Sequence, residues 1–302
     1  MAQALAIPGD VRHSFELMVS FEHDFGRITG MAASGKRNKC ILLCDYLRKN
    51  LVLVDSRGNF INSLPTESEP YDVAITWSNI GYVTLPNARS VLQVDPELMV
   101  VLMKIPCPDC NNSVLCLSRL PPSETLDESA SQFCAQDDDK EYCMVTSISK
   151  GASYAFKIGP YQTNLSTEDT ESYIMTKTIA FDSLVAKFHM LSNNNIIYCK
   201  SGKDYIIKGN LDQNFSPHRS KIVIPKIEVP SDVCSDDFGN IYVSGKGSNT
   251  IHRLTEEGKV LDIPLASQHG IKQPIAICFN QDYTKFYVAN EWGEKVLVFR
   301  VH

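Results

Sequence analysis

The chain has 302 residues, with 29 Lys and Arg against 35 Asp and Glu, and 43% of its residues are hydrophobic. This composition is that of an ordinary folded protein, so a fully disordered, collagen-like or disulfide-stapled chain is excluded. The longest apolar runs, such as 51–54, are too short to span a bilayer, and the first ten residues lack the features of a signal peptide. We therefore expect a cytoplasmic protein without a membrane partner.

A short motif recurs along the chain, in which Tyr is followed by Val or Cys at the centre of a strand-like segment. Its copies begin at Tyr82, Tyr142, Tyr198, Tyr242 and Tyr287, with 42–43 as a degenerate first copy. The gaps are 40, 60, 56, 44 and 45 residues, and three of them match the roughly 40–50-residue period of a propeller blade. The period predicts an all-β, six-bladed β-propeller with insertions in blades three and four.

The neighbours of each copy predict four strands, a to d, in every blade. Strand a is expected about nine to eleven residues before the motif, at 31–33, 73–75, 133–135, near 188–190, 233–234 and 277–279. The motif itself is strand b, an alternating run after it is strand c, and a glycine turn such as that at Gly258 leads into strand d. Almost no segment has the periodicity of a helix.

The two ends of the chain predict how the ring closes. The sixth copy ends on a strand c near 296–300, whereas residues 15–21 alternate like a strand but precede the first strand a. This N-terminal strand would complete the last blade and remove two exposed edges. We therefore assign 1–11 to a tail and 12–302 to one propeller, with acidic loop insertions near 118–141 and 159–183.

The fifth copy has the most distinctive sequence. It reads Val229-Pro230-Ser231-Asp232-Val233, then Gly239-Asn240-Ile241-Tyr242-Val243, Asn249-Thr250-Ile251 and Glu257-Gly258-Lys259. This resembles the NHL repeat, although Asp72, Asp232 and Ala276 stand where that repeat has Gly after Pro. The resemblance implies a relative of the propeller that ends tripartite-motif (TRIM) proteins and selects a protein or RNA partner. No Cys/His series for a RING domain occurs in the sequence.

The ten cysteines mostly fall on equivalent strand positions, where a free Cys behaves as a small buried hydrophobe. Cys107 and Cys110 are the exception, a lone C-x-x-C between blades. A zinc site needs four ligands, and no second pair follows, so this motif is either a metal site or an ordinary pair of loop thiols. We expect no small-molecule cofactor.

The six loops between strands b and c are expected to meet at one face of the ring. They contain eight Lys or Arg against four Asp or Glu, although the whole chain is acidic. Such a cluster would attract acidic ligands, and aromatic side chains there could act as anchors. The predicted partner-binding residues are Tyr46, Arg48, Lys49, Asn87, Arg89, Lys150, Lys203, Lys246, Asn249, Trp292 and Lys295. The alternative is that these are ordinary polar turns.

Asp72 and Asp232 begin equivalent strands beside the central channel. They could hold a divalent cation, as the acids of six-bladed lactonases hold calcium, or they could bond the backbone of the next blade. The expected function is a non-catalytic module that recruits a protein partner to a TRIM-type ubiquitin ligase or scaffold. The alternatives are binding of single-stranded RNA by the same face, and a metal-dependent, lactonase-like hydrolase.

Overall fold

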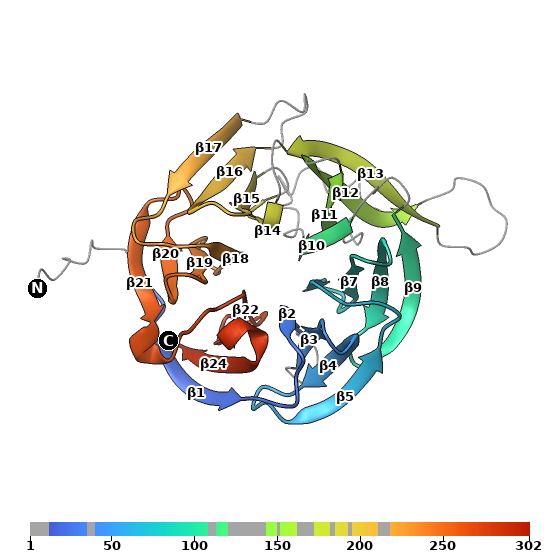
Figure 1. Cartoon of the computed structure of the whole chain (residues 1–302), viewed down its shortest axis with the longest axis horizontal. Helices are drawn as coiled ribbons and strands as arrows, with labels where there is room; N and C mark the ends of the chain where they lie inside the picture. The colour runs from blue at the N-terminus through green and yellow to red at the C-terminus, as the bar shows by residue number, and fades with distance from the viewer. Residues whose placement is uncertain are drawn as a thin grey trace, which may run out of the picture.

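The computed structural model describes residues 12–34, 40–107, 113–119, 143–149, 152–161, 172–181, 185–192, 195–210 and 218–302. Within these residues the strands form six four-stranded antiparallel sheets, which surround a common axis (Figure 1). The predicted all-β propeller is therefore confirmed. No helix in the described part of the chain is long and apolar enough to cross a membrane.

In each sheet the strands follow one another in chain order from the axis to the rim, apart from the sheet that joins the two ends of the chain. The first three sheets are β2 (Ile28–Ala33), β3 (Ile41–Asp45), β4 (Asn50–Val54) and β5 (Phe60–Pro65); β6 (Val73–Ile75), β7 (Gly81–Leu85), β8 (Ser90–Asp95) and β9 (Val100–Pro106); and β10 (Ser113–Arg119), β11 (Cys143–Ser149), β12 (Ala152–Tyr161) and β13 (Ser172–Phe181). The others are β14 (Val185–Met190), β15 (Asn195–Lys200), β16 (Tyr205–Asn210) and β17 (His218–Val223); β18 (Pro230–Ser235), β19 (Ile241–Gly245), β20 (Thr250–Leu254) and β21 (Val260–Ala266); and β22 (Ala276–Phe279), β23 (Lys285–Asn290), β24 (Lys295–Val301) and β1 (Phe15–Phe21).

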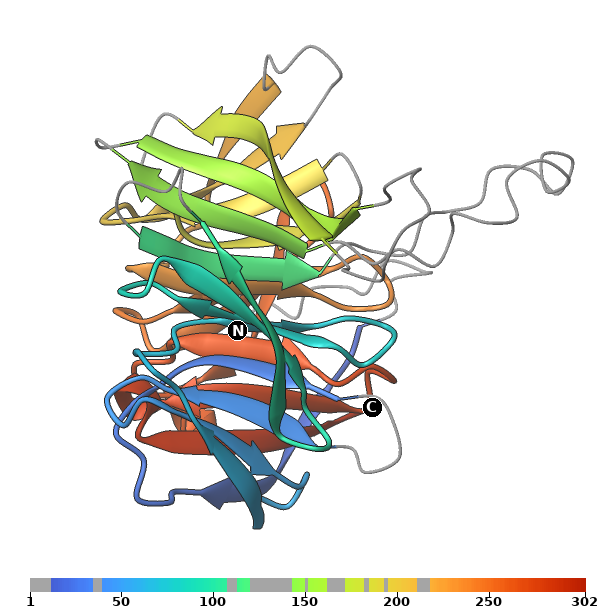
Figure 2. The same ribbon diagram turned by 90° about the vertical axis from the view of Figure 1, so that its right-hand side faces the viewer.

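The strands run through the thickness of the ring (Figure 2), so successive connections alternate between its two faces. Connections from strand a to b and from c to d lie on one face. Connections from b to c, and from strand d to the next strand a, lie on the opposite face. This topology decides which loop residues can form a site together.

The recurring tyrosines are buried at the centres of the second strands. Tyr198, Tyr242 and Tyr287 have no exposed surface, and Tyr82 is 3% exposed. Their strands β7, β15, β19 and β23 are packed between neighbouring sheets, because a propeller sheet is covered on both sides. The aromatic and β-branched residues of the motif fill that space. For this reason the motif recurs at the same place in these four sheets.

The N-terminal strand completes the last sheet, as predicted. β1 pairs antiparallel with β24 from Phe15 opposite Val301 to Phe21 opposite Val296. The ring of Phe15 packs against Tyr242 and Phe286, with centroids 5.8 and 5.3 Å away. The closure therefore buries aromatic surface as well as pairing two strand edges.

The third sheet differs from the prediction. Its inner strand is β10, twenty residues before the expected segment 133–135, and that segment lies outside the described residues. Within the stretch near 159–183, residues 172–181 form the outer strand β13 instead of a loop. Sequence spacing misplaced these strands because a long insertion separates strand a from strand b in this blade. The tail 1–11 and most of 118–141 also lie outside the described residues.

The seven cysteines whose side chains the structure describes are free thiols, and all of them but the half-buried Cys278 are buried. Burial raises the pKa of Cys44, Cys199 and Cys234 well above the usual range, so these thiols stay protonated. They act as buried hydrophobes, as predicted. Cys107 is 1% exposed, whereas Cys110 lies outside the described residues.

Candidate functional site

One position recurs on the inner strands of all six sheets. In four sheets it directly follows a β-bulge, where the pairing with the second strand shifts by one residue. A bulge re-aims the side chain that follows it. The equivalent residues, in chain order, are Gly30, Asp72, Cys116, Lys187, Asp232 and Ala276.

Asp72 and Asp232 each bond the backbone of the next sheet, as one of the two predicted alternatives states. The Oδ2 atom of Asp72 accepts the Leu117 N–H at 2.9 Å, and that of Asp232 accepts the Ile277 N–H at 2.8 Å. Asp232 Oδ1 also accepts the Val233 N–H at 2.9 Å. The repeated bond joins adjacent sheets at the wall of the channel, and it uses up acceptor capacity that a metal ion would need.

Lys187 supplies the cation at the centre of the ring. Its Nζ forms a short ion pair with Asp72 Oδ1, and it lies 5.4 Å from the centroid of the Tyr71 ring. Lys187 is 4% exposed, and burial alone would favour the neutral amine. The charges of Asp72 and Asp232 outweigh that effect and raise its pKa, so the ammonium stays charged.

A calcium site of the predicted kind does not fit these residues. Among the six equivalent positions the only carboxylates are those of Asp72 and Asp232, both committed to backbone N–H groups, and Lys187 stands between them. A bound divalent cation would have to share this space with an ammonium group. The channel therefore holds its own positive charge, and any chemistry here must be argued without a metal ion at this place.

A cavity of about 450 Å³ extends from Asp72 and Asp232 toward the face of the a–b connections. Its wall is formed by the inner strands, and its rim by the loops that carry Trp77, Asp237 and Tyr283. Within the described residues its lining contains five acidic side chains and no Lys or Arg. The cavity therefore favours neutral or cationic ligands over anions.

Ser235 and His189 form a hydrogen-bonded pair in the wall of this cavity. The Ser235 Oγ and His189 Nε2 atoms are 2.8 Å apart, and both residues line the cavity and are half-buried. They come from neighbouring inner strands, β18 and β14. An imidazole at this distance can accept the proton of a serine hydroxyl, which is the arrangement of an activated nucleophile.

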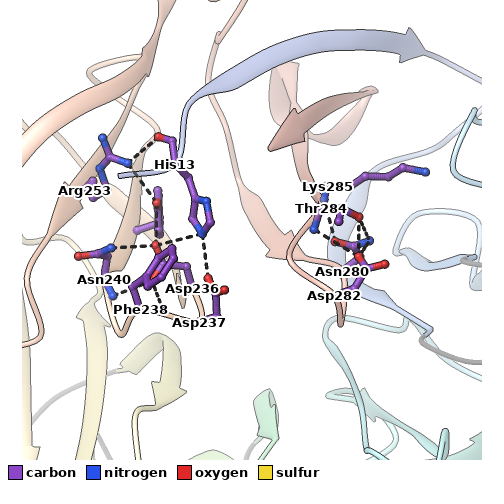
Figure 3. A network of polar contacts seen from close by, with 11 residues as sticks. His13, Asp236, Asp237, Phe238, Asn240, Arg253, Asn280, Asp282, Thr284 and Lys285 are labelled. Atoms are coloured by element: carbon purple, nitrogen blue, oxygen red, sulfur yellow. Dashed lines mark hydrogen bonds and ion pairs between the residues drawn. The ribbon is translucent and has the colours of Figure 1, made fainter. Parts of the chain in front are cut away.

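A second histidine lies beside the acidic residues at the rim. His13 Nε2 is 2.8 Å from Asp237 Oδ1 and 3.9 Å from Asp236 Oδ2, and its ring packs on Phe238 (Figure 3). Asp236 is already saturated, since its carboxylate accepts N–H groups of Phe238 and Asn240 and the Tyr242 hydroxyl. His13, Asp236 and Asp237 lie close enough together to share a metal ion. In this structure, however, His13 and Asp237 act as a pair that holds the N-terminal strand to β18 and its following loop.

Three of the predicted cationic residues on the b–c face are neutralised. Arg48 pairs with Asp24 at 2.5 Å, Lys49 with Glu69 at 3.2 Å, and Lys295 with Glu22 at 3.1 Å. Asp24, Glu69 and Glu22 lie on the connections from one sheet to the next, which share this face with the b–c loops. The sequence argument counted only the b–c loops, so it missed these acids and overestimated the positive field.

The other predicted residues of this face have mixed roles. Asn87 donates to Glu69 at 2.8 Å, Asn249 Oδ1 accepts the Gln273 N–H at 2.7 Å, and Tyr46 packs edge-on against Tyr71. Arg89 and Lys203 lie in turns, and Lys150 is outside the described residues. Trp292 and Lys246 do meet, because the Lys246 Nζ lies 4.2 Å from the indole centroid.

Sequence reasoning missed Lys187, His189 and Ser235. The fourth inner strand is the copy whose register the sequence left uncertain around 188–190, and the bulge before Lys187 adds one further residue of shift. Ser235 follows the segment 233–234 directly, but a serine at the end of a strand carries no signal by itself. The bulges that set this register occur in four of the six sheets and belong to the folded strand pairing, so the sequence alone does not reveal them.

No protein-family model and no curated protein sequence matches this chain. Solved structures do match its fold. A gluconolactonase from Xanthomonas campestris has a TM-score of 0.67 at 9% identity, covering 93% of this chain and 88% of its own. A luciferin-regenerating enzyme has a TM-score of 0.62 at 11% identity (92% and 91%), and virginiamycin B lyase from Staphylococcus aureus one of 0.59 at 12% identity (95% and 99%).

These neighbours correct the expected function. They are enzymes, so the prediction of a non-catalytic recognition module, and with it the prediction of no enzymatic activity, is overturned. The NHL and TRIM resemblance is not confirmed, and binding of a protein or RNA partner stays a prediction. At 9–12% identity the likeness shows the fold alone. The chain is therefore a β-propeller of the architecture seen in lactonase-type and lyase enzymes.

Proposed function

We propose that this protein is a hydrolase that opens a lactone or ester in its central cavity, with Ser235 as the nucleophile and His189 as its base. The observation that carries the proposal is the 2.8 Å contact between Ser235 Oγ and His189 Nε2 inside a cavity of about 450 Å³. The fold neighbours support the class of reaction, since one of them is a gluconolactonase.

The proposed reaction has two steps. His189 Nε2 takes the proton of the Ser235 hydroxyl while Oγ attacks the carbonyl carbon, and the ring C–O bond then breaks as the leaving oxygen takes that proton. In the second step His189 takes a proton from water, the hydroxide attacks the acyl carbon, and Ser235 leaves with the proton. Both steps are ordinary covalent and general-base catalysis.

The charge of the cavity fits this substrate class. A lactone is neutral and can enter a cavity lined by Asp72, Asp232, Asp236, Asp237 and Glu256. Among the described residues, Asp72 and Glu256 pair with lysines, but Asp232, Asp236 and Asp237 have no lysine partner and repel the carboxylate that hydrolysis produces. The lining would therefore favour the substrate over the product, which promotes product release.

The proposal also differs from the metal-dependent hydrolase predicted from the sequence. The place of the metal ion is taken by the Lys187 ammonium, so the reaction depends on the protein's own nucleophile. We therefore expect hydrolysis to continue in the presence of a chelator.

The test combines turnover with covalent labelling. The full chain would be assayed against neutral γ- and δ-lactones and short nitrophenyl esters in EDTA, and separately treated with a fluorophosphonate that modifies activated serines. We expect mass spectrometry to find the label on Ser235, and Ser235→Ala and His189→Asn to lower kcat/KM by roughly 10²–10⁴-fold.

Ser118→Ala is the matched control. Ser118 lines the same cavity, but its Oγ accepts the Met190 N–H at 2.9 Å. This variant should keep both the label and the activity, and the melting temperature of each variant shows whether it folds. Absence of label on Ser235 together with no turnover of the panel would refute the proposal.

A further inference from the structure

Three side chains meet on the face of the ring opposite the cavity. Arg27 lies between β1 and β2, Lys246 follows β19, and Trp292 lies in η2 (Glu291–Gly293) between β23 and β24. The Arg27 guanidinium carbon is 5.0 Å from the centroid of the Trp292 ring, and the Lys246 Nζ is 4.2 Å from it. Residues from three separate sheets thus gather two cations around one indole.

These two cations lack carboxylate partners of the kind that neutralise Arg48, Lys49 and Lys295. Among the described residues, no carboxylate forms an ion pair with Arg27 or Lys246, in contrast to Arg48, Lys49 and Lys295. The Arg27 Nε atom is buried and has no hydrogen-bond acceptor in the described part of the chain. Burial of Lys246, and after it the charge of Arg27, lowers the pKa of Lys246.

Two positive groups that lie over one indole repel each other, since the charge of Arg27 lowers the pKa of Lys246, and a buried donor without an acceptor is unfavourable. Such an arrangement persists when the surrounding structure fixes it, and it is relieved by an anion. We propose that Arg27, Lys246 and Trp292 form a binding site for a small oxyanion, a carboxylate or a phosphate. A guanidinium and an ammonium that lie over the same indole can offer several donors to the oxygens of such a group.

The backbone holds each residue in place before any ligand binds. The Arg27 N–H donates to Asp45 Oδ1 at 3.0 Å, the Lys246 N–H to the Val229 carbonyl at 3.0 Å, and the Trp292 N–H to the Gln273 carbonyl at 3.2 Å. Trp292 itself adopts a φ of 62°, a left-handed conformation that is uncommon for a bulky residue. Strain of this kind is found where a side chain must be held in a functional position.

The glycine after the tryptophan explains how the loop approaches Arg27. Gly293 has a φ of 89°, and a Cβ added to it would lie 2.2 Å from the carbonyl oxygen of Ile28. Only glycine lets the loop pack this closely on the start of β2, directly after Arg27. The same close approach brings the indole to the guanidinium.

This site is separate from the proposed active site. The b–c loops and the inter-sheet connections carry the oxyanion site, whereas the a–b connections form the rim of the cavity. The two places also differ in charge, since the cavity lining is acidic. Loss of one site should therefore leave the other intact.

The chain contains only two tryptophans, which makes the site directly observable. Trp77 lines the cavity, so Trp77→Phe leaves Trp292 as the single tryptophan. Its fluorescence would be recorded during titration with inorganic phosphate or with acetate, and chloride would keep the ionic strength constant. We expect a saturable change with one of the two probes in the range of about 1–10 mM, and the probe that binds more tightly identifies the class of anion.

Lys246→Met and Arg27→Met, made in the Trp77→Phe background, should each weaken this binding at least about tenfold, because each removes one of the two charges. Lys203→Met is the matched control, since Lys203 lies in a b–c turn of the fourth sheet away from Trp292. It should bind as tightly as the Trp77→Phe protein. Absence of a saturable signal with both probes, or equal binding by the Lys246→Met and Lys203→Met proteins, would overturn the proposal, whatever the outcome of the hydrolase assays.

Discussion

The Lys187 ammonium and the Asp72 carboxylate form an ion pair at the centre of the ring, although 115 residues separate them in the sequence. Both side chains are buried, and Asp232 contributes a second carboxylate to the same charge cluster. In a buried ion pair, the attraction between the two opposite charges offsets the cost of taking them out of water. Removal of one partner therefore leaves an uncompensated buried charge.

We therefore expect Lys187→Met to destabilise the protein by about 3–5 kcal/mol, because it leaves Asp72 without its cation. Asp72→Asn combined with Lys187→Met should recover part of this loss, since both charges are then absent. Urea unfolding of the two variants measures the difference. Equal midpoints for the wild type and Lys187→Met would show that the pair does not stabilise the ring.

The pKa of Asp232 predicts a pH dependence of stability. Burial raises this pKa from 3.8 to about 6, and the charge of Lys187 acts in the opposite direction. The folded state therefore binds the proton more tightly than the unfolded state, so this contribution to stability is present below about pH 4 and is lost as the pH rises through about 6.

Asp232→Asn removes that titration. We expect the difference in melting temperature, variant minus wild type, to rise between pH 4 and pH 7 and then to level off. The lost hydrogen-bond acceptor adds an amount to this difference that does not change with pH. Taking this difference cancels the titration of the other carboxylates. A difference that does not change with pH would contradict the assignment.

The channel predicts a protein that is insensitive to calcium. Because Lys187 stands where a divalent cation would lie, millimolar calcium should not raise the melting temperature of the wild type, and EDTA should not lower it. Differential scanning calorimetry in the two solutions checks this. A rise that depends on calcium concentration would demonstrate a bound ion, because a ligand of the native state stabilises it by mass action.

Closure of the ring by β1 predicts unequal effects of two substitutions on one strand. Phe15 packs on Tyr242 and Phe286, so Phe15→Ala should lower stability by about 3 kcal/mol. Leu17 is 49% exposed, and Leu17→Ala should change stability by less than about 0.5 kcal/mol. Denaturant unfolding compares them, and similar losses for both would argue against a specific role of the Phe15 contact.

Much of the fold could be predicted from the sequence. The recurring tyrosines mark the second strands because every sheet is covered on both sides, and the alternating segment 15–21 completes the last sheet because the sixth copy lacks a fourth strand. Asp72 and Asp232 were also identified as equivalent, and they make the same backbone bond. The inner strand of the third sheet is predicted at the wrong place, because an insertion between its first and second strands lengthens the distance between them in the sequence.

The sites themselves depend on tertiary structure. By itself, the sequence determined a repeated, all-β chain that closes on its own first strand, because strand periodicity and turn residues act over short distances. Only the folded ring decided that Lys187 meets Asp72, that His189 meets Ser235 46 residues away, and that acids between the sheets neutralise three of the loop cations. These contacts join different sheets, and their register depends on bulges and ring closure, which no local pattern of residues records.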